Sequence, residues 1–145
     1  MSAVASVARA LYNWFGGDQS ASSIYAALGG RLYIRGSAPP DTAWPYGVYQ
    51  ILDGRPDWAQ DHTAETLSVQ FSLFTDDDPD GAAADELLDK LRARYDHVEL
   101  TFPGGEYRTI WCRPRMYTPA MPADPEETGD RRMVVAEYEL WVAET

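Results

Sequence analysis

The sequence predicts a single α+β domain in which helices pack on one face of a mainly antiparallel β-sheet. Apolar residues recur every three or four positions near the N-terminus and again over 82–95, which is the spacing of amphipathic helices. Elsewhere apolar and polar residues alternate, as they do in half-buried strands. The 145 residues, of which 45% are hydrophobic, contain no internal repeat and no linker, so residues 1–145 are expected to share one core.

The first third of the chain predicts two helices and a short strand. The face of the first helix is formed by Val4, Val7, Ala8, Leu11, Tyr12 and Phe15. Gly16 and Gly17 end this helix. A shorter helix is expected over 20–28, followed by a strand over 31–35.

The middle of the chain predicts two strands separated by a long loop. The first strand covers 45–51, with Pro45 tolerated at its start. Residues 53–64 contain Gly54, Pro56 and three aspartates, which favour a loop. The second strand, over 66–73, has the clearest two-residue period of the chain.

The last part of the chain predicts one further helix and three strands. The acidic run at 75–79 favours a helix start, because carboxylates stabilise helix N-termini. Strands over 98–102 and 107–112 are expected to form a hairpin. Residues 113–130 contain four prolines and predict a second long loop, and a final strand covers 132–142.

Charge and cysteine content limit the classes of function. Twelve basic and 23 acidic residues give a formal net charge of −11, which opposes sequence-independent binding to nucleic acid and to anionic membranes. The single cysteine, Cys112, excludes an intramolecular disulfide and a four-cysteine zinc site, and favours a reducing compartment. No signal peptide and no apolar stretch of bilayer-spanning length is recognised.

No catalytic residue, cofactor or metal site is predicted. The nucleotide-binding and hydrolase motifs with defined spacing are absent. His62 and His97 lie in different elements and are expected at the surface, and Cys112 is expected to be a small core residue.

The run Asp76 to Gly81 matches the first half of a calcium-binding loop. Its second half does not match, because Leu87 stands where a bidentate glutamate is needed. A helix cap explains the same carboxylates. A small acidic cation- or ligand-binding module nevertheless remains an alternative function.

The aromatic content favours an assembly surface over chemistry. Five Trp and nine Tyr are more than one small core easily buries, although packing at the rim of the sheet remains an alternative explanation. Trp, Tyr, Met and Arg are enriched at protein interfaces. The candidate interface residues are Trp58, Arg113, Arg115, Met116, Tyr117 and Met121.

Several segments together resemble the tail-completion, or tail-terminator, proteins of long-tailed bacteriophages. The resemblance covers nearly the whole chain, from about residue 4 to 143, through segments of packing residues. These segments are Ile24–Leu28, Gly30–Tyr33, Trp44–Tyr49, the strand Leu67–Phe74, the helix Ala82–Tyr95 and the closing Arg131–Val135.

The resemblance implies a non-enzymatic virion protein that assembles in the host cytoplasm. Such a protein forms a ring, expected to be a hexamer, at the head-proximal end of the tail tube. The ring stops tube growth and contacts the tail tube protein and the head connector or a neck protein. DNA passes through it without specific binding, and the final strand is a candidate for pairing between subunits. A neck protein one ring nearer the head is an alternative.

Overall fold

The computed structural model describes residues 3–59, 62–124 and 129–145, except for the side chains of residues 55–63. The helices are α1 (Val4–Gly16), α2 (Ile24–Leu28) and α3 (Ala82–Tyr95). The strands are β1 (Leu32–Ile34), β2 (Tyr46–Ala59), β3 (His62–Thr75), β4 (Tyr107–Tyr117), β5 (Met121–Pro122) and β6 (Arg132–Glu144). No helix in the described ranges is long and apolar enough to cross a membrane.

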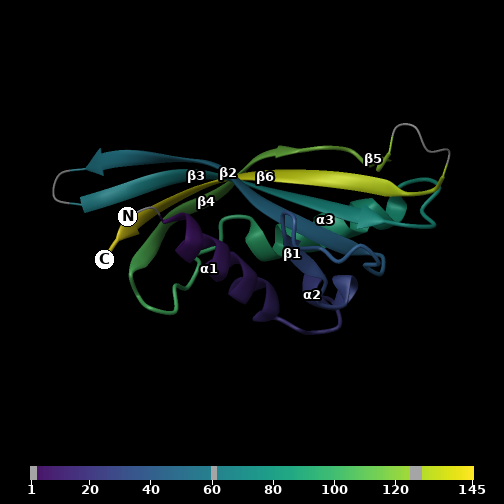
Figure 1. Ribbon diagram of the computed structural model, residues 1–145, viewed down its shortest axis with the longest axis horizontal. Coiled ribbons are helices and arrows are strands. Elements are labelled where there is room, and N and C mark those ends of the chain that lie inside the picture. The colour runs from purple at the N-terminus through teal and green to yellow at the C-terminus, as the bar shows by residue number, and fades with distance from the viewer. Residues whose placement is uncertain (1–2, 60–61, 125–128) are drawn as a thin grey trace.

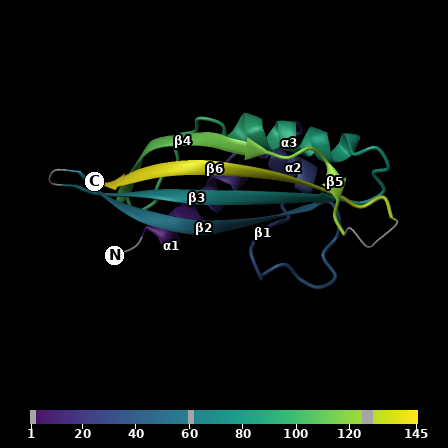
Figure 2. The ribbon, with the colours of Figure 1, turned by 90° about the horizontal axis from the view of Figure 1, so that it is seen from above.

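The strands form one 6-stranded sheet in the order β1-β2-β3-β6-β4, with β5 pairing to β6. The pairing of β1 with β2 is parallel, and the other described pairings are antiparallel. The three helices lie on one face of the sheet, and the other face is bare (Figure 1). Viewed from above, β2, β3, β6 and β4 follow one another across the sheet (Figure 2). The predicted α+β fold is therefore confirmed.

The helix α1 forms where the sequence predicts it, although its buried face is rotated. Its buried residues are Val7, Ala10, Leu11 and Phe15. By contrast, Val4 is 38% exposed and Tyr12 is 46% exposed, although both were expected to face the core. At the start of α1, the Ala3 N–H donates to Glu65 Oε1 at 3.1 Å. This carboxylate fixes the positive end of the helix against β3.

Three aromatic rings join the helix layer to the sheet. The ring centroid of Phe71 on β3 lies 4.7 Å from that of Tyr95 on α3 and 5.9 Å from that of Tyr138 on β6. All three side chains are buried. The Tyr95 hydroxyl donates to the carbonyl of Leu11 at 2.7 Å, which links α3 to α1. These contacts hold both long helices against the centre of the sheet.

The helix α3 confirms the prediction over 82–95, and its start shows how the acidic run is used. Asp78 is 3% exposed and accepts hydrogen bonds from the N–H groups of Ala83 and Ala84 at 3.1 and 2.9 Å. Asp80 accepts from the N–H of Ala82 at 3.0 Å. The carboxylates thus satisfy N–H groups that have no partner within the helix.

The predicted loop over 53–64 is wrong, because β2 and β3 continue through most of it as a hairpin. Register runs unbroken from Asp53 opposite Ser68 to Ala59 opposite His62. Pro56 is accommodated because no described strand lies on the other side of β2 there, and a proline is tolerated on an edge strand. The favourable pairing with β3 outweighs the turn-forming composition.

The predictions for 98–130 and for the final strand also need correction. Residues 98–102 form no strand, because β6, and not this segment, pairs with β4. The expected loop over 113–130 begins with five residues of β4 and contains β5. The final strand β6 lies between β3 and β4, so it is not an edge strand. Its backbone is already paired on both sides, and the expected pairing of this strand between subunits is therefore wrong. The edge on this side of the sheet is β4.

Candidate assembly surface

The bare face of the sheet carries a polar centre in which each arginine lies beside a glutamate. Arg113 Nη2 lies 2.8 Å from Glu139 Oε1, and its guanidinium stacks 4.3 Å from the centroid of the Trp111 ring. Trp111 Nε1 donates to the same oxygen at 3.1 Å. Partial burial acts to raise the pKa of Glu139, but the Arg113 bond and charge and the Trp111 bond together lower it. Glu139 is therefore held as a carboxylate.

Arg115 repeats this arrangement one row further along β4. Its Nη1 lies 3.4 Å from Ser68 Oγ and 3.9 Å from Glu137 Oε1. A register shift between Pro114 and Met116 leaves Arg115 as the extra residue of a bulge. Bulges redirect side chains, and this one places Arg115 over the face of the sheet. The centre of the face is thus a patch of balanced charge in an acidic protein.

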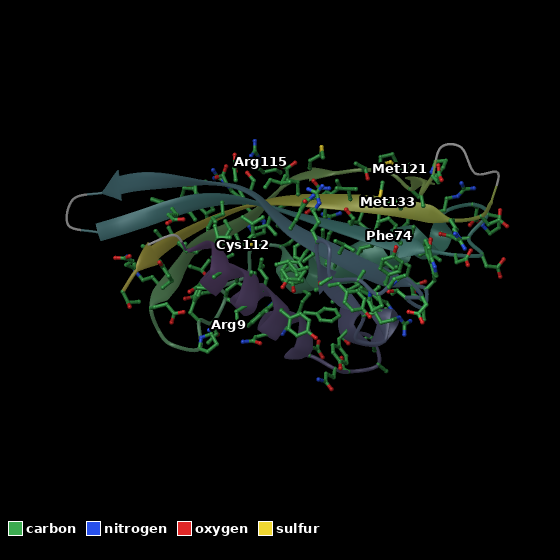
Figure 3. All side chains as sticks on the ribbon, in the orientation of Figure 1. Arg9, Phe74, Cys112, Arg115, Met121 and Met133 are labelled. Carbon is green, nitrogen blue, oxygen red and sulfur yellow. The ribbon has the colours of Figure 1, made fainter. Side chains whose placement is uncertain are left out.

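Beyond this centre the surface becomes apolar. Met116 is 46% exposed, and Met121 on β5 lies opposite Met133 on β6. Arg115, Met121 and Met133 lie along the side of the sheet opposite the helices (Figure 3). Flexible methionine side chains adapt to varied partner surfaces. Arg113, Arg115 and Met116 on β4 and Met121 on β5 therefore follow one another along β6.

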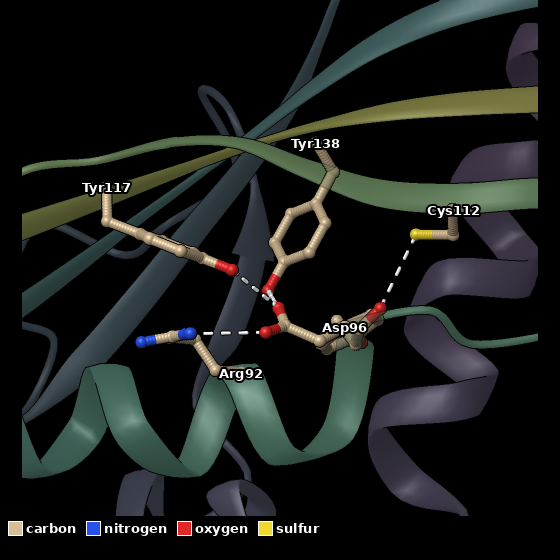
Figure 4. Close-up of polar contacts among 6 residues, drawn as sticks. Arg92, Asp96, Cys112, Tyr117 and Tyr138 are labelled. Atoms are coloured by element: carbon tan, nitrogen blue, oxygen red, sulfur yellow. Dashed lines mark hydrogen bonds and ion pairs between the residues drawn. The ribbon is translucent and has the colours of Figure 1, made fainter.

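Tyr117 belongs to a different environment. Its hydroxyl donates to Asp96 Oδ1 at 2.8 Å, and the hydroxyl of the buried Tyr138 donates to the same oxygen at 2.6 Å (Figure 4). Arg92 Nε binds Asp96 Oδ2 at 3.3 Å, and its guanidinium lies 4.2 Å from the Tyr117 ring centroid. Tyr117 therefore fixes the end of β4 to the end of α3, on the helix side of the sheet.

Trp58 lies apart from the other candidate interface residues. It is located in β2, which β3 and β6 separate from β4. Its side chain lies outside the described residues. The candidate set thus divides between two opposite edges of the sheet.

Sequence reasoning missed an aromatic group at the apolar end of the bare face. The Tyr46 and Phe74 rings stack with centroids 4.9 Å apart, and the Trp44 centroid lies 5.0 Å from that of Tyr46. The guanidinium of Arg131 lies 4.9 Å from the Trp44 centroid. All three rings are partly exposed. The sequence contained a signal for this group. Every second residue from Thr66 to Ser72 is polar, and Phe74 occupies the next position of that series, so its ring was to be expected on the face opposite the core.

The residues with reactive chemistry form no catalytic arrangement in the described part of the chain. Cys112 is 2% exposed, and its thiol donates to the Tyr95 carbonyl at 3.5 Å (Figure 4). Burial raises the pKa of this thiol to about 12. His97 is exposed, while the His62 side chain lies outside the described residues. Within the described ranges, no group of three or more His, Cys, Asp or Glu is placed to hold a metal ion.

Comparison with known proteins gives similarity in structure and none in sequence. No protein family matches the sequence, and no curated protein is similar to it. A chain in the solved virion of a native gene transfer agent (GTA) particle superposes with a TM-score of 0.78 at 17% identity, covering 99% of this chain and 99% of that chain. A second solved chain has a TM-score of 0.52 at 17% identity, covering 97% of this chain and 92% of the other. The protein therefore has the fold of a chain found in a phage-like particle.

Proposed function

We propose that this protein is a non-enzymatic structural component of a phage-like virion. In this proposal it forms a ring, a hexamer, that caps the head-proximal end of the tail tube. The ring stops tube growth and joins the tail to the head connector. Its partners are other copies of itself, the tail tube protein and a connector or neck protein.

The observation that carries this proposal is the structural match to the gene transfer agent virion. It extends over 99% of this chain and 99% of that chain. The segments that resemble tail-terminator proteins map onto α2, β1, β2, β3, α3 and β6. The fold shared with a virion chain and the resemblance of these segments both support the proposal.

The surface supports an assembly role. Met116, Arg113 and Arg115 lie on a sheet face that none of the described helices covers. Residues of these types are enriched at interfaces. A net charge of −11 also suits a ring through which DNA passes, because an acidic wall does not retain a polyanion.

The cation-binding alternative is less well supported. The oxygens of Asp78 that would coordinate calcium already accept hydrogen bonds from Thr75, Ala83 and Ala84. Binding of a cation would have to replace these bonds. A neck ring nearer the head uses the same type of surface and is the competing position within the virion.

The test is assembly of the purified protein. Light scattering after size-exclusion chromatography, over a range of concentrations, should give a mass that is a multiple of 16.2 kDa. Negative-stain electron microscopy should show rings, and added protein should bind the ends of tail tubes from the same particle. A strict monomer that binds no tube end refutes the proposal. Binding to isolated head connectors but not to tubes favours the neck position.

A further inference from the structure

The sheet has two free edges on opposite sides of the molecule. On one side, β1 pairs with β2 from Gly47 to Tyr49, and the Arg35 N–H bond to the Tyr49 carbonyl, at 2.9 Å, extends this contact by one residue. From Ile51 onward, no described strand pairs with this side of β2. On the other side, β4 pairs with β6 alone among the described strands. Free strand edges present unpaired backbone groups and so favour contacts with other chains.

A hollow of about 260 Å³ lies beside the free edge of β4. It is bounded by residues 97–99 on one side and by residues 109–112 of β4 on the other. The Thr109 hydroxyl holds the two walls together through bonds of 3.0 and 3.3 Å with the main chain of Leu100. Its lining is mixed: Val98, Ile110 and Trp111 contribute apolar surface, and His97, Glu99 and Thr109 contribute polar surface. It exceeds the engineered cavities of about 150 Å³ that hold a benzene molecule, so one large apolar side chain can enter it.

Leu52 is an apolar side chain of suitable size on the other free edge. It is the extra residue of a bulge between Ile51 and Asp53, and it is 46% exposed. Its position lies just beyond the part of β2 that β1 covers. The molecule thus carries an exposed leucine on one edge and, on the opposite edge, a hollow lined in part by apolar residues.

The charges on the two edges favour a second copy joined head to tail. Between Tyr107 and Tyr117, β4 carries Arg108, Arg113 and Arg115 and no acidic residue. Arg113 and Arg115 are paired with Glu139 and Glu137 on β6, and Arg108 is exposed. Pairing of β4 with β4 of another copy would place like charges together, which is destabilising. The free edge of β2 carries the exposed Asp53 beside Leu52. A contact between two different edges repeats around a closed rotation, which is how cyclic rings form.

The contact is confined to the first part of β4. Pro114 lacks an N–H, and the bulge at Arg115 interrupts the strand directly after it. Both features limit strand addition at an edge. The hollow lies before them, beside Thr109 to Cys112. A second register shift, between Thr109 and Trp111, falls within the hollow, so the contact there is made by a side chain and not by a paired strand. The accessible docking region is therefore short and centred on the hollow.

We propose that Leu52 on the β2 edge of one copy enters the hollow beside β4 of the next copy, with Asp53 lying near Arg108 of that strand. This inference rests on the proposed ring and identifies the contact that builds it. Both elements of the contact belong to every copy, so each subunit uses its Leu52 on one neighbour and its hollow on the other.

Cysteine pairs test this contact directly. A Leu52→Cys protein is mixed with a Glu99→Cys protein, and the mixture is oxidised. A disulfide-linked dimer is expected from the mixture, and the Leu52→Cys/Glu99→Cys double variant should give a ladder of linked subunits. An Arg9→Cys partner is the matched control, because Arg9 is exposed on α1 in the helix layer (Figure 3). The native Cys112 is buried, so the wild type should not crosslink. Equal crosslinking with the control, or equally strong self-crosslinking of Glu99→Cys alone, overturns the proposal.

A second variant keeps the test independent of crosslinking. Leu52→Glu should weaken self-association at least tenfold in sedimentation velocity, and Leu52→Met should retain it. Tyr12→Glu is the control, because Tyr12 is also 46% exposed but lies on α1. If Leu52→Glu assembles like the wild type, this contact is wrong while the proposed ring stands. If the wild type neither self-associates nor binds tube ends, the proposed function fails as well.

Discussion

Replacement of Asp78 by alanine tests how the acidic run before α3 contributes to stability. Asp78 accepts hydrogen bonds from the Thr75 hydroxyl at 2.8 Å and from the Ala83 and Ala84 N–H groups. Loss of a helix cap costs about 0.5–2 kcal/mol, and the upper end applies because three donors lose one buried acceptor. We expect the free energy of unfolding to fall by about 2 kcal/mol and the Tm by roughly 6 °C.

The pH dependence of the same variant has a defined sign. Burial acts to raise the pKa of Asp78, but its bonds to Thr75, Ala84 and Ala83 and the charge of Arg132 lower it below its ordinary value of 3.8. A carboxyl group with a lowered pKa in the folded protein stabilises it fully above the unfolded pKa. This contribution is lost as the pH falls through the folded pKa. The difference between wild type and Asp78→Ala should therefore be constant near neutral pH and shrink below about pH 4.

Urea denaturation followed by circular dichroism, at several pH values, measures both effects. Asp89→Ala is the matched control, because Asp89 is an exposed residue within α3. It should change the free energy of unfolding by less than about 0.5 kcal/mol. If Asp78→Ala behaves like this control, the cap does not carry the stability assigned to it. A rise in Tm with calcium that depends on Asp78 would instead restore the cation-binding alternative.

Three further predictions concern buried and exposed groups around β4. Tyr138→Phe should lower the free energy of unfolding by about 1.5–3 kcal/mol in urea titrations, because Asp96 loses a partly buried charge-assisted bond; a change near zero would mean that the existing bonds from Tyr117 and Arg92 hold Asp96 without it. The Cys112 thiol, its pKa raised to about 12 by burial, should not react with an aromatic disulfide reagent at pH 8 until urea unfolds the chain; rapid reaction in the folded state would contradict its burial. Met116→Ala should leave the free energy of unfolding within about 0.5 kcal/mol of wild type while weakening assembly, whereas Tyr117→Ala should destabilise the fold by about 2 kcal/mol. Thermal melts and light scattering separate these effects, and equal destabilisation by both variants would place Met116 in the core.

The long predicted loops show why local composition misleads at the edges of a sheet. Gly54 and Pro56 favour turns, yet both lie in β2, because its partner β3 supplies the pairing and its outer side is free. Pro114 lies in β4 for the same reason. An edge strand tolerates a residue without an N–H group on its open side. A deletion within 53–64 would therefore remove paired residues of β2 and β3, whereas a deletion within an unpaired loop would leave the sheet intact.

Sequence periodicity alone determined the elements that bury one face. The two-residue period identified β3 and β6, and the three-to-four-residue spacing identified α1 and α3, because side chains on one face of an element must all reach the same core. From these elements the α+β class followed. The residue types of the candidate surface, arginine and methionine between 113 and 121, were also recognisable without a structure.

Only the tertiary structure decided which strands lie at the edges and which side chains share a surface. β6 pairs with β3 and with β4, so the last strand in sequence lies inside the sheet. Tyr117 turns toward Asp96, while Arg115 and Met116 remain on the bare face. Leu52 and the hollow beside β4 lie on opposite edges. Strand order depends on hydrogen bonds between segments far apart in the chain, and local patterns carry no record of those partners.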